Sequence, residues 1–376
     1  MTQKLYLLIG RVTLIIVIMI SMTGCTQVAM KTKEITLGVA WPFDSDTSLF
    51  EEGIDMAVEE INKDGGIDGQ KLILLKRDDA SETAKGLTLA QNLSEDKKVM
   101  AVIGHKNSYV SVPASAIYEE AGLVMLSPAS TAPELTKNNK GNIFRVIPSD
   151  VILAQNMAEH LKTLENKRIV IYYSNDAYGK GLADAIEDEF MKCGITVVDR
   201  FNYYSGVEEL KRLHKRWNAF GFDGIFVAAA MAQGSQFIND ARQAGINTLF
   251  IGGNALDSTK LAEQIGNMDT NIIIGSVFNP ERSNLARTFT KTFTEKYNHD
   301  PDMYASLGYD AVHILAASIK SSKELNRESV AEELRNLGEW AGVCGVHEFS
   351  VNGDEVGDLI VIKKLRNGDF LPIEEQ

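Results

Sequence analysis

From Glu34 onward, short apolar runs rich in β-branched residues alternate with longer segments in which apolar positions recur every three or four residues. The short runs predict buried strands, and the longer segments predict amphipathic helices. The expected strands cover residues 35–40, 72–76, 99–103, 123–126, 168–173, 196–201, 224–228, 249–251 and 272–277. The expected helices include residues 49–62, 84–93, 110–120, 152–164, 179–191 and 235–244. This alternation predicts an α/β fold in which helices cover both faces of parallel sheets.

The strands are too many for one compact sheet, and a new strand–helix series starts after the segment 145–150. We therefore expect two lobes, with a helix-rich stretch at 281–337 and a final strand at 359–365 before the turn Asn367-Gly368. In open α/β sheets, ligands bind in the crevice beyond the carboxyl ends of the strands. The loops at these ends are 40–48, 104–108 and 127–131 in the first lobe, and 174–178, 229–233 and 252–257 in the second.

Residues 1–24 have the features of an export signal, because Lys4 and Arg11 precede the apolar run 12–20 and small residues follow it. A run of this length is too short to span a membrane by itself. The segment leads into Met22-Thr-Gly-Cys25, which resembles the bacterial lipobox, whose cysteine is lipidated and becomes the new N-terminus. The sequence therefore predicts a signal peptide at 1–24, a lipid anchor on Cys25 at the cell envelope and a polar tether at 25–33. The alternative is an ordinary signal peptide with a chance cysteine.

Composition narrows the class of protein further. The 376 residues suffice for two domains, and an apolar fraction of 44% can fill two cores. The formal charge of −13 argues against a nucleic-acid partner, because that function requires a positive surface to displace counterions. Beyond Cys25 the chain has two cysteines, Cys193 and Cys344, and no pattern brings them together. We therefore expect two free thiols.

Signatures of catalysis and of metal binding are missing from the sequence. No serine stands in a G-x-S-x-G setting, no H-E-x-x-H motif is present, and the six histidines lack metal-ligand spacing. His105 follows an expected strand and could reach the crevice, but without a partner group a role in bracing its loop is favoured. The sequence predicts a protein that is not an enzyme and that uses neither a cofactor nor a metal.

Ser108 and the small-residue loop 127–131 form the most informative polar group. Ser108 opens an expected helix after a strand, where free backbone N–H groups and the helix dipole favour an anion such as a carboxylate. Thr131 and the carbonyl of Ala129 offer acceptors nearby, which suit an ammonium group. Together they would fit the head group of an amino acid. The alternative is that Ser108 and Thr131 only cap their own helices.

Several segments, in colinear order over almost the whole mature chain, resemble the Leu/Ile/Val-binding type of substrate-binding protein of ABC importers. They include EEINKDGGIDGQKL (59–72), VIGH (102–105), PASAIYEEAGL (113–123), SPASTAPEL (127–135) and YGKGLADAI (178–186). The resemblance implies the type I periplasmic binding protein fold, with two Rossmann-like lobes joined by three crossovers near 149, 278 and 354 that close on a small ligand. The first lobe would comprise 34–149 and 279–354, and the second 150–278 and 355–376. A membrane permease of the importer is the implied partner.

The resemblance also implies a set of ligand-binding residues: Ser108, Ala129, Ser130, Thr131, Tyr178 and Tyr304. The chain departs from the family at several positions. Asn254 stands where branched-chain amino-acid binders place a glutamate on the ligand ammonium, and Ala230 replaces a tyrosine. Ser81 and Asn107 stand at the two cysteine positions of the family disulfide.

The loss of the glutamate weakens the case for an amine ligand, although Asp257, Asp44 or Asp46 could supply the charge instead. Trp41 and Phe43 lie near the expected cleft mouth and either stack on the ligand or pack in the core. We expect the ligand to be a small carboxylate-bearing molecule, either an amino acid or a related organic acid. An aromatic group on the ligand would suit Tyr178 and Tyr304. Leucine, isoleucine and valine should be poor ligands. A ligand-sensing receptor that passes a signal to a membrane partner is the alternative function.

Overall fold

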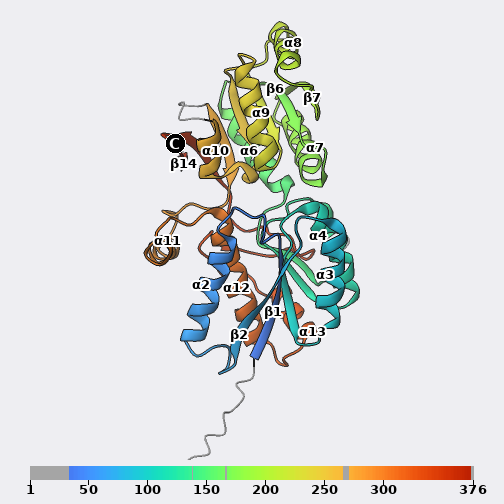
Figure 1. Ribbon diagram of the computed structural model, residues 1–376, viewed down its shortest axis with the longest axis vertical. Helices are drawn as coiled ribbons and strands as arrows, with labels where there is room; N and C mark the ends of the chain where they lie inside the picture. Colours follow the sequence, from blue (N-terminus) through green and yellow to red (C-terminus); the bar gives the residue numbers. More distant parts are fainter. Residues whose placement is uncertain (1–33, 138, 166, 266–270, 374–376) are drawn as a thin grey trace, which may run out of the picture.

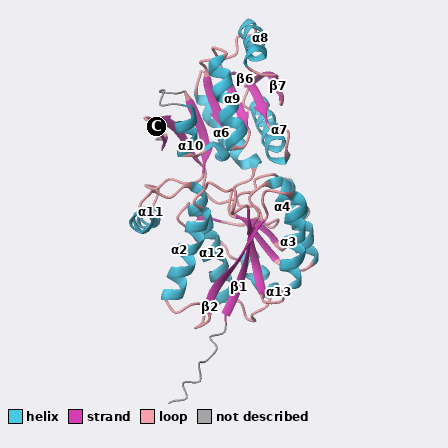
Figure 2. Ribbon diagram, in the orientation of Figure 1, coloured by secondary structure: helices cyan, strands magenta, loops and turns pink. Residues whose placement is uncertain are grey.

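The computed structural model describes residues 34–373 except 138, 166 and 266–270. The expected signal peptide, Cys25 and the tether lie outside the described residues. Figure 1 shows two lobes stacked along the long axis of the molecule, and Figure 2 shows that each lobe has a sheet flanked by helices. This arrangement confirms the predicted α/β class with two parallel-sheet lobes.

The first lobe is built on a five-stranded parallel sheet of order β2-β1-β3-β4-β5. Its strands are β1 (Glu34–Trp41), β2 (Lys71–Asp78), β3 (Val99–Gly104), β4 (Val124–Ser127) and β5 (Ile143–Arg145). One face packs on α2 (Phe50–Lys63) and α12 (Met303–Ser321), and the other on α3 (Thr83–Glu95) and α4 (Ser108–Glu120). Because both faces are covered, the central strands read as continuous apolar runs rather than as alternating patterns.

Helices α2 and α12 approach each other very closely. A Cβ atom at Gly53 would lie 2.1 Å from the carbonyl oxygen of Ala305, so only glycine fits at this crossing. The contact holds the first turn of α12 beside the loop that follows β1. Helices α11 (Asn284–Tyr297) and α13 (Arg327–Arg335) complete this lobe.

The second lobe has a seven-stranded sheet of order β14-β13-β10-β9-β8-β6-β7. The parallel strands are β6 (Arg168–Tyr173), β7 (Thr196–Phe201), β8 (Gly224–Ala228), β9 (Leu249–Gly252) and β10 (Ile272–Ser276). Helices α6 (Asp150–Thr163) and α7 (Ala177–Lys192) cover one face. The other face packs on α8 (Val207–Ala219), α9 (Met231–Gln243) and α10 (Thr259–Ile265).

The chain end differs from the sequence expectation of one final strand. Strand β13 (Val361–Arg366) pairs antiparallel with β10 and then turns back into β14 (Asp369–Pro372). Asn367 and Gly368 both have positive φ, of 53° and 93°, which is the backbone of a tight two-residue hairpin turn. The expected turn is therefore present, but it joins two strands.

Three segments connect the lobes: one between β5 and α6, one between β10 and α11, and one between β12 (Val346–His347) and β13. The predicted lobe limits at 149, 278 and 354 fall in these segments and stay predictions. Cys193 and Cys344 are free, as expected from the sequence. Within the described part of the chain, no helix combines the length and the hydropathy needed to cross a bilayer.

Candidate ligand-binding site

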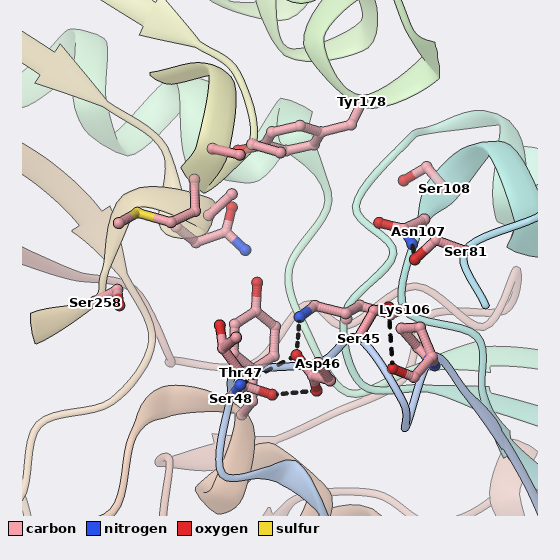
Figure 3. Close-up of a pocket in the computed structure, with 18 of the residues that line it drawn as sticks. Ser45, Asp46, Thr47, Ser48, Ser81, Lys106, Asn107, Ser108, Tyr178 and Ser258 are labelled. Atoms are coloured by element: carbon pink, nitrogen blue, oxygen red, sulfur yellow. Dashed lines mark hydrogen bonds and ion pairs between the residues drawn. The ribbon is translucent and has the colours of Figure 1, made fainter. Parts of the chain in front are cut away.

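A cavity of about 240 Å³ lies between the lobes, at the carboxyl ends of the parallel strands. Figure 3 shows its polar side chains converging from both lobes. All six loops that the sequence nominated contribute to its wall, together with the first turn of α12. The lining residues include Asp46, Ser48, Lys106, Asn107, Ser108, Ala129, Tyr178, Ala230, Asn254, Asp257, Asp302 and Tyr304.

The loop that leads into α4 is braced by His105. Its buried ring places Nδ1 at 2.6 Å from Oδ2 of Asp79 and Nε2 at 3.1 Å from the hydroxyl of Tyr118. The backbone carbonyl of His105 accepts hydrogen bonds from the hydroxyls of Ser111 and Ser127, both at 3.2 Å. His105 therefore braces the loop, as the sequence favoured, because both ring nitrogens are occupied within the first lobe.

A hydrogen bond stands where the family resemblance would place a disulfide. The Asn107 side-chain amide donates to the hydroxyl of Ser81 at 2.8 Å. This contact ties the segment before α4 to the loop after β2. The two substitutions thus retain a direct side-chain link between the loops.

The N-terminus of α4 lies at the cavity wall. Ser108 begins the helix, is 3% exposed and lines the cavity. Its hydroxyl oxygen accepts a weak hydrogen bond from the backbone N–H of Ala132 at 3.4 Å, so its proton can still be donated. The backbone N–H groups of Val110 and Ser111 donate to the Asn107 carbonyl, both at 2.9 Å, so those of Ser108 and Tyr109 are the donors that this helix end can offer to a carboxylate.

Ser130 and Thr131 lie just behind the lining residue Ala129. The hydroxyl of Ser130 bonds to the hydroxyl of Ser111 and to the carbonyl of Lys106, so Ser130 shapes the loop and does not reach the cavity wall. Thr131 is 1% exposed, and its hydroxyl has no hydrogen-bond partner of good geometry among the described residues.

Asp150, the first residue of α6, lies next to Thr131 and was not identified from the sequence. Its backbone N–H donates to the carbonyl of Thr131 at 2.9 Å, and its side chain is fully buried. Burial raises the pKa of Asp150 to about 7, against the opposing effects of the Thr131 hydroxyl and the Arg145 charge. Neither carboxylate oxygen has a well-formed hydrogen bond to a described residue.

Two groups from the second lobe face the same region. The buried hydroxyl of Tyr178 and Oδ1 of Asn254 also lack well-formed hydrogen bonds within the described structure. The Tyr178 hydroxyl lies 2.8 Å from the place of a Cβ at Gly253, directly beside Asn254. Further along α7, a Cβ at Gly181 would lie 3.4 Å from Oδ2 of Asp150. A group of buried oxygen atoms with unused capacity thus lies where the lobes meet.

The two aromatic residues expected from the first lobe take different places. Tyr304 lines the cavity. Trp41 is fully buried, stacks on Phe50 with ring centroids 3.7 Å apart, and meets Tyr304 edge to face at 6.2 Å. Trp41 therefore packs behind Tyr304 and is not part of the cavity wall, because neighbouring rings cover it.

An ion pair missed in the sequence joins Lys106 to Asp46 on the first-lobe side of the cavity. Burial acts to raise the pKa of Asp46, but the charge and hydrogen bond of Lys106 prevail and hold it below its usual value. The Lys106 ammonium also lies 4.8 Å from the centroid of the Tyr304 ring. Lys106 lies in loop 104–108, which the sequence nominated for the site. A single lysine in a strand-end loop was therefore the one sequence feature that could have indicated this ion pair.

The other two acids that could replace the missing glutamate charge either have partners within the protein or lie outside the cavity wall. Asp257 lines the cavity but accepts hydrogen bonds from Lys363 Nζ, at 2.7 Å, and from the hydroxyl of Ser276. Asp44 is exposed and is not a lining residue. Among the described residues, no group of three or more His, Cys, Asp or Glu side chains could hold a metal ion.

Comparison with known proteins gives concordant matches. A family model described as periplasmic binding protein matches residues 34–360. An ABC transporter substrate-binding protein from Desulfitobacterium hafniense, solved in complex with Leu, is 45% identical with a TM-score of 0.85, covering 91% of this chain and 100% of that one. A branched-chain amino acid substrate-binding protein from Streptococcus pneumoniae, solved in complex with isoleucine, is 26% identical with a TM-score of 0.81 and the same coverage. The Leu/Ile/Val-binding protein homolog 3 of Brucella melitensis is 28% identical over 347 residues, 91% of this chain and 94% of its own length.

The matched region spans both lobes and the cavity between them, so the likeness concerns the whole ligand-binding unit. The resemblance seen in the sequence motifs is confirmed, and so is a binding rather than an enzymatic role. This chain belongs to the periplasmic binding protein family, as an extracytoplasmic substrate-binding protein of ABC transporters of the Leu/Ile/Val-binding type.

Proposed function

We propose that this protein captures an α-amino acid in the interlobe cavity and delivers it to the membrane permease of an ABC importer. The observation that carries the proposal is the buried carboxylate of Asp150, which lacks a well-formed hydrogen bond and lies beside the Thr131 hydroxyl. A buried ionised carboxylate without a partner is strongly unfavourable, and an ammonium group is the partner that would offset this.

In this arrangement the ligand carboxylate binds at the N-terminus of α4, to backbone N–H groups and the hydroxyl of Ser108. The ligand ammonium lies between the lobes, at the Ala129 carbonyl, with the Thr131 hydroxyl and the Asp150 carboxylate directly behind this part of the cavity wall. Asn254 and Tyr178 contribute further oxygen atoms from the second lobe. Asn254 stands in place of the family glutamate and carries no charge. Asp150 thus supplies the negative charge for the ligand ammonium.

Truncation of the head-group hydroxyls tests this proposal. Ser108→Ala and Thr131→Ala should each weaken amino-acid binding by roughly 1–3 kcal/mol, because each strands a charged group of the ligand without its hydrogen bond. Isothermal titration calorimetry measures the effect. Ser115→Ala is the matched control, because Ser115 lies on the same helix, does not line the cavity and donates, among the described residues, to the Val112 carbonyl. Unchanged affinity in both site variants would refute the head-group assignment.

We also propose that the mature protein is held at the membrane by a lipid on Cys25. The motif Met22-Thr-Gly-Cys25 after a short apolar run supports this proposal. Labelling with a fatty-acid analogue in the native host should mark the wild type and not Cys25→Ser. Equal labelling of both proteins would contradict it.

A further inference from the structure

The Lys106–Asp46 pair occupies the cavity wall away from the head-group residues. Figure 3 shows the Lys106 side chain extending over the loop that carries Asp46 and Ser48, on the side of the cavity opposite Tyr178. The side chain of Asp46 is 6% exposed and that of Lys106 is 23% exposed. If the head group of an amino acid binds near Tyr178 and Ser108, its side chain extends toward this pair.

Asp46 has no capacity left for a ligand. Its Oδ1 accepts from the Lys106 ammonium and from the backbone N–H of Ser48, at 3.1 Å. Its Oδ2 accepts from the indole N–H of Trp41 and from the hydroxyl of Ser48. A carboxylate has about four acceptor positions, so these four donors fill them. Asp46 therefore orients Lys106 and cannot recruit a cationic side chain.

Lys106 retains donor capacity that faces the cavity. An ammonium group has three N–H donors, and among the described residues one of them is used, by Asp46. The ring of Tyr304 lies against the same ammonium at 4.8 Å from its centroid, so the region is only partly open to water. Placing an aliphatic side chain here would remove water from the remaining donors without replacing its hydrogen bonds. A side-chain oxygen atom would satisfy them.

The charge balance favours a neutral oxygen over a second carboxylate. Asp46 neutralises Lys106, and Lys363 neutralises Asp257. Asp302, which also lines the cavity, accepts from the backbone N–H groups of Leu49 and Ala305; it forms no direct ion pair among the described residues, although the Lys106 charge also acts on it. An additional negative side chain would therefore lie near two carboxylates and one already paired cation.

We infer that this site selects amino acids whose side chain presents a neutral oxygen acceptor, an amide or a hydroxyl, to Lys106. The inference rests on the proposed function, because it takes the amino-acid head group as bound near Ser108 and Asp150. It deepens the earlier expectation that branched-chain amino acids are poor ligands, and it gives that expectation a structural cause.

Pairs of ligands with the same shape and different polarity give the direct test. Calorimetry on the wild-type protein compares asparagine with leucine, threonine with valine, and glutamine with glutamate. We expect the neutral polar member to bind at least tenfold more tightly in its pair, in whichever pair fits the cavity. Tighter binding of leucine or valine, or of glutamate over glutamine, would overturn the inference and leave the proposed function standing. Failure of every amino acid to bind would refute both.

Substitution of Lys106 assigns the preference to its ammonium group. Lys106→Met should weaken binding of the preferred polar ligand by roughly 10- to 150-fold, the usual range for a lost charge-assisted hydrogen bond, and leave its aliphatic counterpart equal or tighter. Because this change leaves Asp46 unpaired, Asp46→Asn/Lys106→Met is measured beside it. Lys85→Met is the control, since Lys85 pairs with Asp78 in the same lobe and does not line the cavity. An unchanged preference in both Lys106 variants would overturn the inference.

Discussion

Replacing Asp150 with asparagine should separate ligand binding from stability, with opposite effects on the two. Asp150 is fully buried, and its pKa is raised from 3.8 to about 7. Below pH 3.8, Asp150 is protonated in both the folded and the unfolded protein, so it does not destabilise the fold. Its destabilising contribution grows as the pH rises to about 7 and stays constant above that value.

The size of the effect follows from the displacement of the pKa. About three pKa units correspond to roughly 4 kcal/mol of destabilisation of the ligand-free protein at pH 8. An asparagine cannot ionise, but its buried amide would lack partners and cost about 1–3 kcal/mol. We therefore expect Asp150→Asn to increase the free energy of unfolding of the ligand-free protein by about 1–3 kcal/mol at pH 8, and to decrease it by about 0.5–2.5 kcal/mol at pH 4, where Asp150 is nearly neutral but the amide still lacks partners.

The same substitution should weaken amino-acid binding, because the ligand ammonium loses its counter-charge. A loss of about 2–3 kcal/mol corresponds to roughly 30- to 150-fold in the dissociation constant. Urea unfolding of the ligand-free protein and calorimetry with the ligand measure the two effects, with Asp188→Asn on the exposed face of α7 as the control. A variant that is less stable at pH 8 yet binds as tightly as the wild type would refute the reasoning.

Three further outcomes are expected. Binding to the wild type should tighten as the pH rises to about 7, because the ligand ammonium binds the ionised form of Asp150. Below pH 7 binding should release a proton from Asp150, which calorimetry in buffers of different ionisation enthalpy detects. Arg145→Met should cost about 3–5 kcal/mol of stability in urea and weaken binding, because the buried guanidinium donates to the carbonyls of Ser130 and Ala132 and to Asp354. His347→Gln should lose about 3 kcal/mol below pH 6.5 and progressively less up to pH 9. Burial acts to lower the pKa of His347, but Asp310 and Glu355 raise it to about 9, so its stabilising effect fades over this range.

The fold was largely predictable because the apolar runs of parallel strands are buried on both faces and therefore stand out in the sequence. Each nominated strand of the two parallel sheets is present, within one or two residues at its ends. The exceptions are short or partly polar elements. Strand β5 has three residues, and β14 has four that alternate between exposed and half-buried, so neither forms an apolar run.

The location of the site was predictable for a topological reason, because parallel strands bring their carboxyl ends to one edge and the loops there converge. Its electrostatics were not. Lys106 and Asp46 are 60 positions apart, and their pairing depends on how two loops meet. Asp150 follows a proline-containing segment and has the sequence features of an ordinary helix start. Its significance comes from complete burial between the lobes, which local sequence does not encode.

Native mass spectrometry of the protein freshly purified from its own host would test the central claim most directly, because tight ligands remain bound through purification. We expect a bound molecule identified as an α-amino acid, which is retained by the wild type and lost from Asp150→Asn. A retained organic acid without an amino group, such as a keto acid or an aromatic acid, would contradict the assignment of Thr131 and Asp150 as the ammonium site.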